Sequence, residues 1–167
     1  MDPAETALAT LAPVFPPLPS AVIPPRGRVL ALDWGERRIG LALSDELQIL
    51  ATPLDTLVRR TGKRFPMPAF LAHVQKHQPV GLLVGLPLTL QGGEEASAVA
   101  ARDLGRLVGI RTGLPVEYWD ERLSTARALG AIREVGGSTR GRREEVDALA
   151  ASVLLQHWLE ARRETRR

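Results

Sequence analysis

The chain has 167 residues, of which 44% are hydrophobic and 25% are charged, and its formal net charge is +3. These values are typical of a single globular domain, and so mild a positive charge does not by itself indicate a nucleic-acid partner. The absence of cysteine excludes disulfides, thiolate metal sites and cysteine nucleophiles. No stretch approaches the roughly 20 uninterrupted apolar residues of a membrane helix, so we expect a cytoplasmic protein with no membrane contact.

The first part of the chain predicts a leader followed by three strands. Residues 1–26 hold seven of the thirteen prolines and predict a poorly ordered leader. The continuous apolar run at 28–34 predicts a buried strand, and a hairpin turn joins it to a second strand at 38–45. A third strand is expected at 49–58, where Pro53 favours the edge of the sheet.

The rest of the chain alternates between helical and extended patterns. The expected elements are a helix at 67–77, a strand at 80–85, a helix at 94–111, a strand at 116–119, a helix at 125–134 capped by Ser124, and a helix at 143–161. We therefore predict one α/β domain over 27–162 and a basic tail at 163–167. The C-terminal arginines, from Arg162 onward, are expected to be frayed. Its mixed five-stranded sheet combines an antiparallel three-strand meander with two parallel strands, flanked by helices.

Carboxylates stand where predicted strands end. Asp33 closes the first apolar run, and Asp120 with Glu121 closes the last strand. Because sites in open α/β sheets form at the carboxyl ends of parallel strands, these acids are expected to converge. Asp147 lies on the apolar face of the final helix, near its start, and is expected to point toward the same edge.

Several carboxylates at one sheet edge repel one another unless a cation compensates them. Oxygen ligands suit Mg²⁺ or Mn²⁺, and one or two such ions activate water and clamp a phosphodiester. We therefore predict catalytic roles for Asp33, Asp120, Glu121 and Asp147, with Asp33, Glu121 and Asp147 as metal ligands. Strand alternation in the sequence alone does not decide between Asp120 and Glu121.

Each carboxylate also has a simpler interpretation when it is taken alone. Asp33 or Asp120 can accept hydrogen bonds from the backbone of a neighbouring turn. Glu121 can pair with Arg122 in solvent, and Asp147 can interact favourably with the N-terminal end of its helix. The combined placement of the four acids favours the metal site.

Arginine supplies all but two of the 22 basic residues, and its planar guanidinium suits phosphate groups. Candidate phosphate ligands lie in the first hairpin, beside the acidic pair and in the glycine-containing loop before the last helix: Arg37, Arg38, Arg122, Arg140, Arg142 and Arg143. A solvated surface is the alternative interpretation of the loop arginines.

Four motifs in order resemble those of the YqgF/RuvX family: LDWGERRIGLALSD, LLVGLPLTLQG, VEYWDERLST and EVDALAASVLL. The resemblance spans about residues 29–159 and implies an RNase H-like fold and Holliday-junction resolvase or pre-16S rRNA nuclease activity. It also implies that Asp33, the Asp120–Glu121 pair and Asp147 match the acidic positions of the family. Glu36 and the TLQGG stretch depart from the family pattern, which affects substrate contacts more than metal binding.

The leading hypothesis is a divalent-metal-dependent endonuclease that acts on structured nucleic acid, either an rRNA precursor or branched DNA. Symmetric cleavage of a junction would favour a homodimer, because two matched cuts need two sites. A catalytically silent nucleic-acid-binding module of the same fold is one alternative. Another is an actin/hexokinase-like nucleotide-binding protein, since LDWG and its hairpin resemble the first phosphate loop of that superfamily, although 167 residues leave no room for a second half.

Overall fold

The computed structural model describes residues 22–59, 64–87, 96–120 and 143–167. In chain order their elements are β1 (Val29–Asp33), β2 (Arg38–Ser44), β3 (Ala51–Val58), α2 (Met67–His77), β4 (Gly81–Leu86), α3 (Ala96–Thr112), β5 (Val116–Asp120) and α5 (Arg143–Glu164). The predicted helix at 125–134 and its cap Ser124 lie outside the described residues.

The five strands form one sheet in the order β3-β2-β1-β4-β5. Strand β2 pairs antiparallel with both β1 and β3, whereas β4 pairs parallel with β1 and with β5. This arrangement confirms the predicted meander followed by two parallel strands. Strand β3 lies at the edge, as Pro53 indicated, and the β2–β3 register shifts at Leu41/Ala42 next to the proline.

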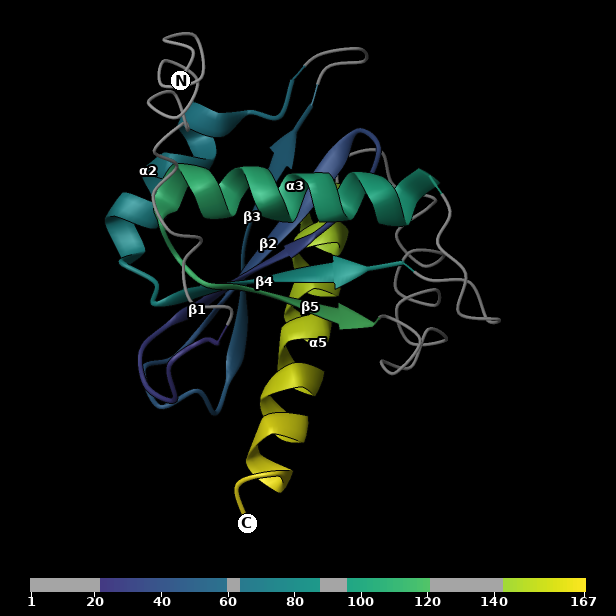
Figure 1. Cartoon of the computed structure of the whole chain (residues 1–167). Coiled ribbons are helices and arrows are strands. Elements are labelled where there is room, and N and C mark those ends of the chain that lie inside the picture. Colours follow the sequence, from purple (N-terminus) through teal and green to yellow (C-terminus); the bar gives the residue numbers. More distant parts are fainter. Residues whose placement is uncertain (1–21, 60–63, 88–95, 121–142) are drawn as a thin grey trace, which may run out of the picture.

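Helices cover both faces of the sheet, with α2 and α3 on one side and α5 on the other (Figure 1). Successive residues of β1 point to opposite faces, so Leu30 and Leu32 pack against α2 and α3 while Val29 and Ala31 pack against α5. All four side chains are fully buried. A strand buried on both faces needs apolar residues at every position, which explains the unbroken apolar run in the sequence.

Local sequence explains where the helices begin and end. Helix α2 carries a proline in its first turn, where a missing N–H costs no helical hydrogen bond, and it ends at Gln78 in the left-handed conformation. Helix α3 ends at Gly113, whose φ of 71° suits a glycine, and the Gly113 N–H donates to the carbonyl of Gly109. Among the helices of the described residues, none is long and apolar enough to cross a membrane.

The third strand begins two residues later than predicted, at Ala51. The side chain of Asp45 accepts hydrogen bonds from the backbone N–H groups of Ile49 and Leu50, at 2.7 and 2.9 Å. Although burial opposes it, these backbone bonds lower the pKa of Asp45. Residues 49 and 50 therefore belong to a turn built around the carboxylate, and both apolar side chains are exposed.

Arg162 is part of the packed structure, which corrects its assignment to a frayed tail. Helix α5 continues to Glu164, and the Arg162 guanidinium lies 4.6 Å from the centroid of the Trp158 ring. The guanidinium also donates to the carbonyl of Ile23 and lies 3.4 Å from an oxygen of Glu117. Ile23, from the predicted leader, is itself fully buried; residues 1–21 of that leader lie outside the described residues.

Candidate active site

Asp33 and Asp147 lie near each other because both contact Gly40 of β2. Asp33 ends β1 with only 3% of its surface exposed, and its cross-strand partner on β2 is Gly40. A Cβ atom built on Gly40 would overlap the backbone carbonyl of Asp147. The start of α5 therefore lies directly on Gly40, beside Asp33. Strand alternation from Ala31 places the Asp33 side chain on this same α5 side of the sheet.

An arginine from β2 holds the carboxylate of Asp147. The Nε of Arg38 donates to Oδ2 of Asp147 at 2.5 Å, and both side chains are partly buried, at 32% and 19% exposure. Arg38 was predicted to bind phosphate, and in this structure its Nε is occupied by the carboxylate. Charge-assisted hydrogen bonds of this kind fix geometry as well as neutralising charge. Arg38 thus positions Asp147 relative to β2.

The acidic residue at the end of β5 lies on the other side of the sheet. Tyr118 packs with the α2/α3 core and Trp119 with the α5 core, so alternation places Asp120 on the α3 side. Glu121, the next residue, lies outside the described residues. Within the parts of the chain that the structure describes, no three His, Asp or Glu side chains are grouped closely enough to hold a metal.

The other predicted phosphate ligands divide into described and undescribed residues. Arg37 is exposed in the turn between β1 and β2. Arg143 is the first residue of α5, and its side chain is not described. Arg122, Arg140 and Arg142 lie outside the described residues. The structure therefore brings together Asp33, Asp147 and Arg38, with Arg37 in the adjoining turn.

Sequence reasoning missed two relevant residues, Gly40 and Arg59, and only Gly40 left a signal in the sequence. Gly40 interrupts the apolar pattern of β2, and a glycine inside a strand often marks the close approach of another backbone. Arg59 follows β3; its guanidinium lies 4.7 Å from the centroid of the Trp34 ring and donates to the carbonyl of Glu36. The sequence shows an arginine after the third strand, but no pattern in the sequence indicates that Trp34 is its partner.

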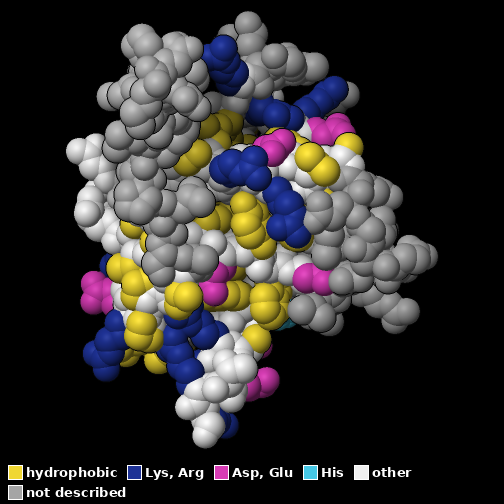
Figure 2. Space-filling view, viewed as in Figure 1, with side chains coloured by type: hydrophobic (Ala, Val, Ile, Leu, Met, Phe, Trp, Pro, Cys, Tyr) yellow, Lys and Arg dark blue, Asp and Glu magenta, His cyan; other side chains and the backbone are white. Residues whose placement is uncertain are grey.

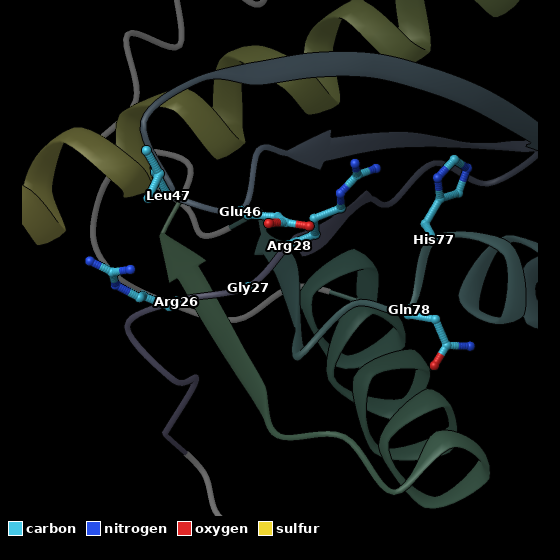
Figure 3. A pocket seen from close by; sticks show the side chains of 7 residues that line it. All are labelled: Arg26, Gly27, Arg28, Glu46, Leu47, His77 and Gln78. Carbon is cyan, nitrogen blue, oxygen red and sulfur yellow. The ribbon is translucent and has the colours of Figure 1, made fainter.

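A separate pocket of about 240 Å³ lies at the other end of the strands, where Gly27 and Arg28 precede β1. Figure 3 shows Arg26 and His77 at opposite ends of this pocket, so its basic side chains do not converge on one point. Burial, together with the nearby charges of Lys76, His73 and Arg28, lowers the pKa of His77. Glu46 is the one carboxylate among its described lining residues, so this pocket lacks the paired acids of the candidate active site.

The sheet topology, with a carboxylate at the end of its central strand and another at the start of the last helix, defines an RNase H-like fold. The structure is similar to that of T. thermophilus RuvC in complex with a Holliday junction substrate, with a TM-score of 0.50 and 21% sequence identity. The likeness covers 83% of this chain and 97% of the RuvC chain. The predicted fold class is confirmed.

The family model described as "RuvX: Holliday junction resolvase" matches residues 27–161. A protein of Koribacter versatilis is 42% identical over 144 residues, covering 86% of this chain and 92% of the relative. A protein of Rubrobacter xylanophilus is 46% identical over 141 residues, covering 82% and 95%. Both are named "Putative pre-16S rRNA nuclease". The chain belongs to the RuvX family, and the family resemblance predicted from the four motifs is confirmed.

Proposed function

We propose that this protein is a divalent-metal-dependent endonuclease that hydrolyses phosphodiester bonds in structured nucleic acid, with the precursor of 16S rRNA as its principal substrate. The observation that carries the proposal is the meeting of Asp33 and Asp147 over Gly40, since 114 positions of sequence (147 − 33) separate the two acids. The names of the relatives support the rRNA substrate. The description of the family model supports a Holliday junction as the second candidate.

The chemistry of the donor set fits a hard cation. Asp33 and Asp147 offer only oxygen atoms, as Mg²⁺ and Mn²⁺ prefer, and one of the two carboxylates is almost fully buried. We assign Asp33, Asp147 and Glu121 as the metal ligands. Glu121 is favoured over Asp120 because alternation from Tyr118 and Trp119 places Asp120 on the α3 side of the sheet, away from Asp33. When bound, one or two such ions would supply charge neutralisation and an activated water.

The chain's own residues orient the substrate and hold the acids in place. Arg38 fixes Asp147 against β2 through its Nε, so the carboxylate is positioned before substrate arrives. Arg37, exposed in the adjoining turn, is placed to bind a backbone phosphate. We assign the same role to Arg122, Arg140, Arg142 and Arg143. Asp120 remains the alternative acid at the end of β5.

The test is cleavage by the purified full chain of a labelled 16S rRNA precursor fragment and of a synthetic four-way junction, with Mg²⁺, with Mn²⁺ and with EDTA. We expect metal-dependent cleavage of the rRNA fragment. Asp33→Asn and Asp147→Asn should each lower the rate by at least about 100-fold, because each removes a charge from the metal site. Thermal unfolding of both variants checks that they remain folded.

A matched control is Asp55→Asn, an exposed carboxylate on edge strand β3 that pairs with His73 at 2.7 Å and lies outside the site. This variant should cleave at the parent rate. Parent-like cleavage by both site variants would refute the assignment. Metal-independent nucleic-acid binding without any cleavage would favour the silent binding module instead. Symmetric cleavage of the junction would indicate a homodimer. Processing of an rRNA precursor would be consistent with a cytoplasmic protein.

A further inference from the structure

A groove with a volume of about 480 Å³ lies on the α2/α3 side of the sheet, immediately beside the candidate active site. Trp34 forms one wall, Phe65 and Met67 at the start of α2 form another, and Leu104 and Leu107 of α3 form the third. The volume is in the range of small-molecule binding sites. Trp34 directly follows Asp33, so the groove and the active site are adjacent across the end of β1.

One wall of the groove is a fixed pair of flat groups. The guanidinium of Arg59 lies over the Trp34 ring, 4.7 Å from its centroid. Its Nε and Nη2 donate to the carbonyl of Glu36 at 3.0 and 2.5 Å, and its backbone N–H donates to the carbonyl of Arg37. These bonds hold the guanidinium plane in one orientation. A planar cation held in this way is a surface on which a nucleobase can stack.

The groove is also positively charged. Among the described residues that line it, Arg59, Arg64 and Arg111 are basic and Asp103 is acidic, which leaves a formal charge of +2 (3 − 1). Arg64 and Arg111 are exposed, so their guanidinium groups are accessible to a ligand. Figure 2 shows basic side chains beside apolar ones on the surface along α3. Flat, apolar and cationic surfaces together match a base linked to phosphate.

We propose that this groove binds an unpaired nucleotide of the nucleic-acid substrate, with its base stacked against the aromatic and guanidinium wall and its phosphate near Arg64 or Arg111. The ligand is unpaired because a base inside a duplex already has both faces covered by its neighbours. The inference rests on the proposed nuclease function and specifies its substrate class further. A single-stranded segment beside the scissile bond would pass from Asp33 into the groove.

The test measures binding by fluorescence anisotropy in EDTA, with the full chain carrying Asp33→Asn so that no cleavage occurs. The two probes are a labelled RNA duplex with a single-stranded overhang and the same duplex with blunt ends. Arg64→Gln and Arg111→Gln are compared with Arg106→Gln. Arg106 is exposed on the same helix as Arg111 but does not line the groove, so it controls for the loss of one positive charge.

We expect each groove variant to bind the overhang about fivefold more weakly, with a salt dependence reduced by about 0.7 in log–log slope for each lost contact to a single strand. Binding of the blunt duplex should not change, and Arg106→Gln should bind both probes as the parent does. Equal losses with Arg106→Gln, or no preference of the parent for the overhang, would overturn the proposal. Competition by polyglutamate, but not by single-stranded RNA, would overturn it in favour of an acidic protein partner.

The outcomes separate the groove from the nuclease function. Groove variants that bind the overhang like the parent, alongside metal-dependent cleavage by the protein without Asp33→Asn, would refute the groove and leave the function intact. If the groove variants lose overhang binding selectively but the native chain cleaves neither substrate, the groove is supported and the nuclease function is refuted. A double variant, Arg64→Gln/Arg111→Gln, should lose more overhang affinity than either single variant if both arginines contact the same strand.

Discussion

Arg38 and Asp147 form an ion pair with 2.5 Å between Nε and Oδ2, although 109 positions separate them in the sequence. In the proposed site this arginine competes with a metal ion for the same carboxylate. It therefore acts both as a positioning group and as a counter-charge. The pair is partly exposed, so its net contribution is modest, in the range of about 0.2–1 kcal/mol measured for such pairs.

The first prediction concerns this competition. Arg38→Gln should strengthen binding of Mn²⁺ by about two- to fivefold, because it removes the cation that occupies Asp147. Isothermal titration calorimetry on the nucleic-acid-free protein measures the change directly. Arg106→Gln, which removes an equal charge from α3, should leave the affinity unaltered. Weaker Mn²⁺ binding by Arg38→Gln would show that positioning of the carboxylate outweighs competition for it.

The second prediction concerns the contact between Gly40 and the start of α5. Gly40→Ala places a Cβ atom against the Asp147 carbonyl, which must move. We expect a loss of about 1–3 kcal/mol in the free energy of unfolding, as for other overpacked sites. A shift of about 1 Å in a catalytic group costs on the order of 100-fold in rate, so cleavage should fall by about that factor. Urea unfolding and single-turnover cleavage measure the two effects.

Gly109→Ala provides the matched comparison for Gly40→Ala. Its Cβ would lie 3.0 Å from a methyl group of Val116, and Gly109 is inside helix α3. Alanine gains up to about 1 kcal/mol over glycine in a helix interior, which offsets the tight contact. The stability of Gly109→Ala should stay within about 1 kcal/mol of the parent, with unchanged cleavage. Equal damage from both substitutions would argue against a special role for Gly40.

The third prediction concerns Glu117, whose pKa is raised by burial although the nearby Arg162 partly lowers it. A carboxyl group with a raised folded-state pKa contributes stability at low pH that is lost as pH rises through that pKa. Glu117→Gln is neutral at every pH and avoids this loss. The stability of the variant relative to the parent should therefore be more favourable at pH 7 than at pH 4, as measured by urea unfolding.

A companion variant checks the same pair from the other side. Arg162→Met leaves the partly buried Glu117 carboxylate without its cation and should cost about 1–2 kcal/mol at pH 7. The double variant Arg162→Met/Glu117→Gln should recover part of that loss, because no uncompensated charge remains. If the double variant were no more stable than Arg162→Met, the loss would come only from the contacts of Arg162 with Trp158 and Ile23.

Most of the fold followed from hydrophobic patterning. The run from Val29 to Leu32 is apolar because both faces of β1 are covered, and Pro53 correctly placed β3 at the edge of the sheet. The start of β3 was wrong because Ile49 and Leu50 are apolar, and the pattern could not show that Asp45 ties their N–H groups into a turn. Side-chain-to-backbone bonds of this kind compete with strand pairing but leave only a weak trace in sequence.

The acidic residues of the site could be predicted from the sequence, but their contacts and orientations could not. Asp33 was recognisable because a carboxylate at the end of a buried strand needs compensation. The partner that Arg38 takes was not recognisable, because the contact joins residues far apart in the chain. The side of the sheet on which Asp120 lies followed only once Tyr118 and Trp119 were assigned to opposite cores. The packing of Tyr118 and Trp119 therefore decides a question of orientation that the sequence of the acidic pair leaves open.

Ile23 and Arg162, which meet through a carbonyl and a guanidinium, join the first described residues of the chain to the last turns of helix α5. Both lie at the edge of the sheet where β1 and β4 start, since Ile23 also packs against Gly81, the first residue of β4. A group attached at Ile23 or Arg162 would therefore lie at the end of the sheet opposite to Asp33. Closing the two points with a short peptide and opening the chain elsewhere would accordingly be a reasonable route to a circular permutant.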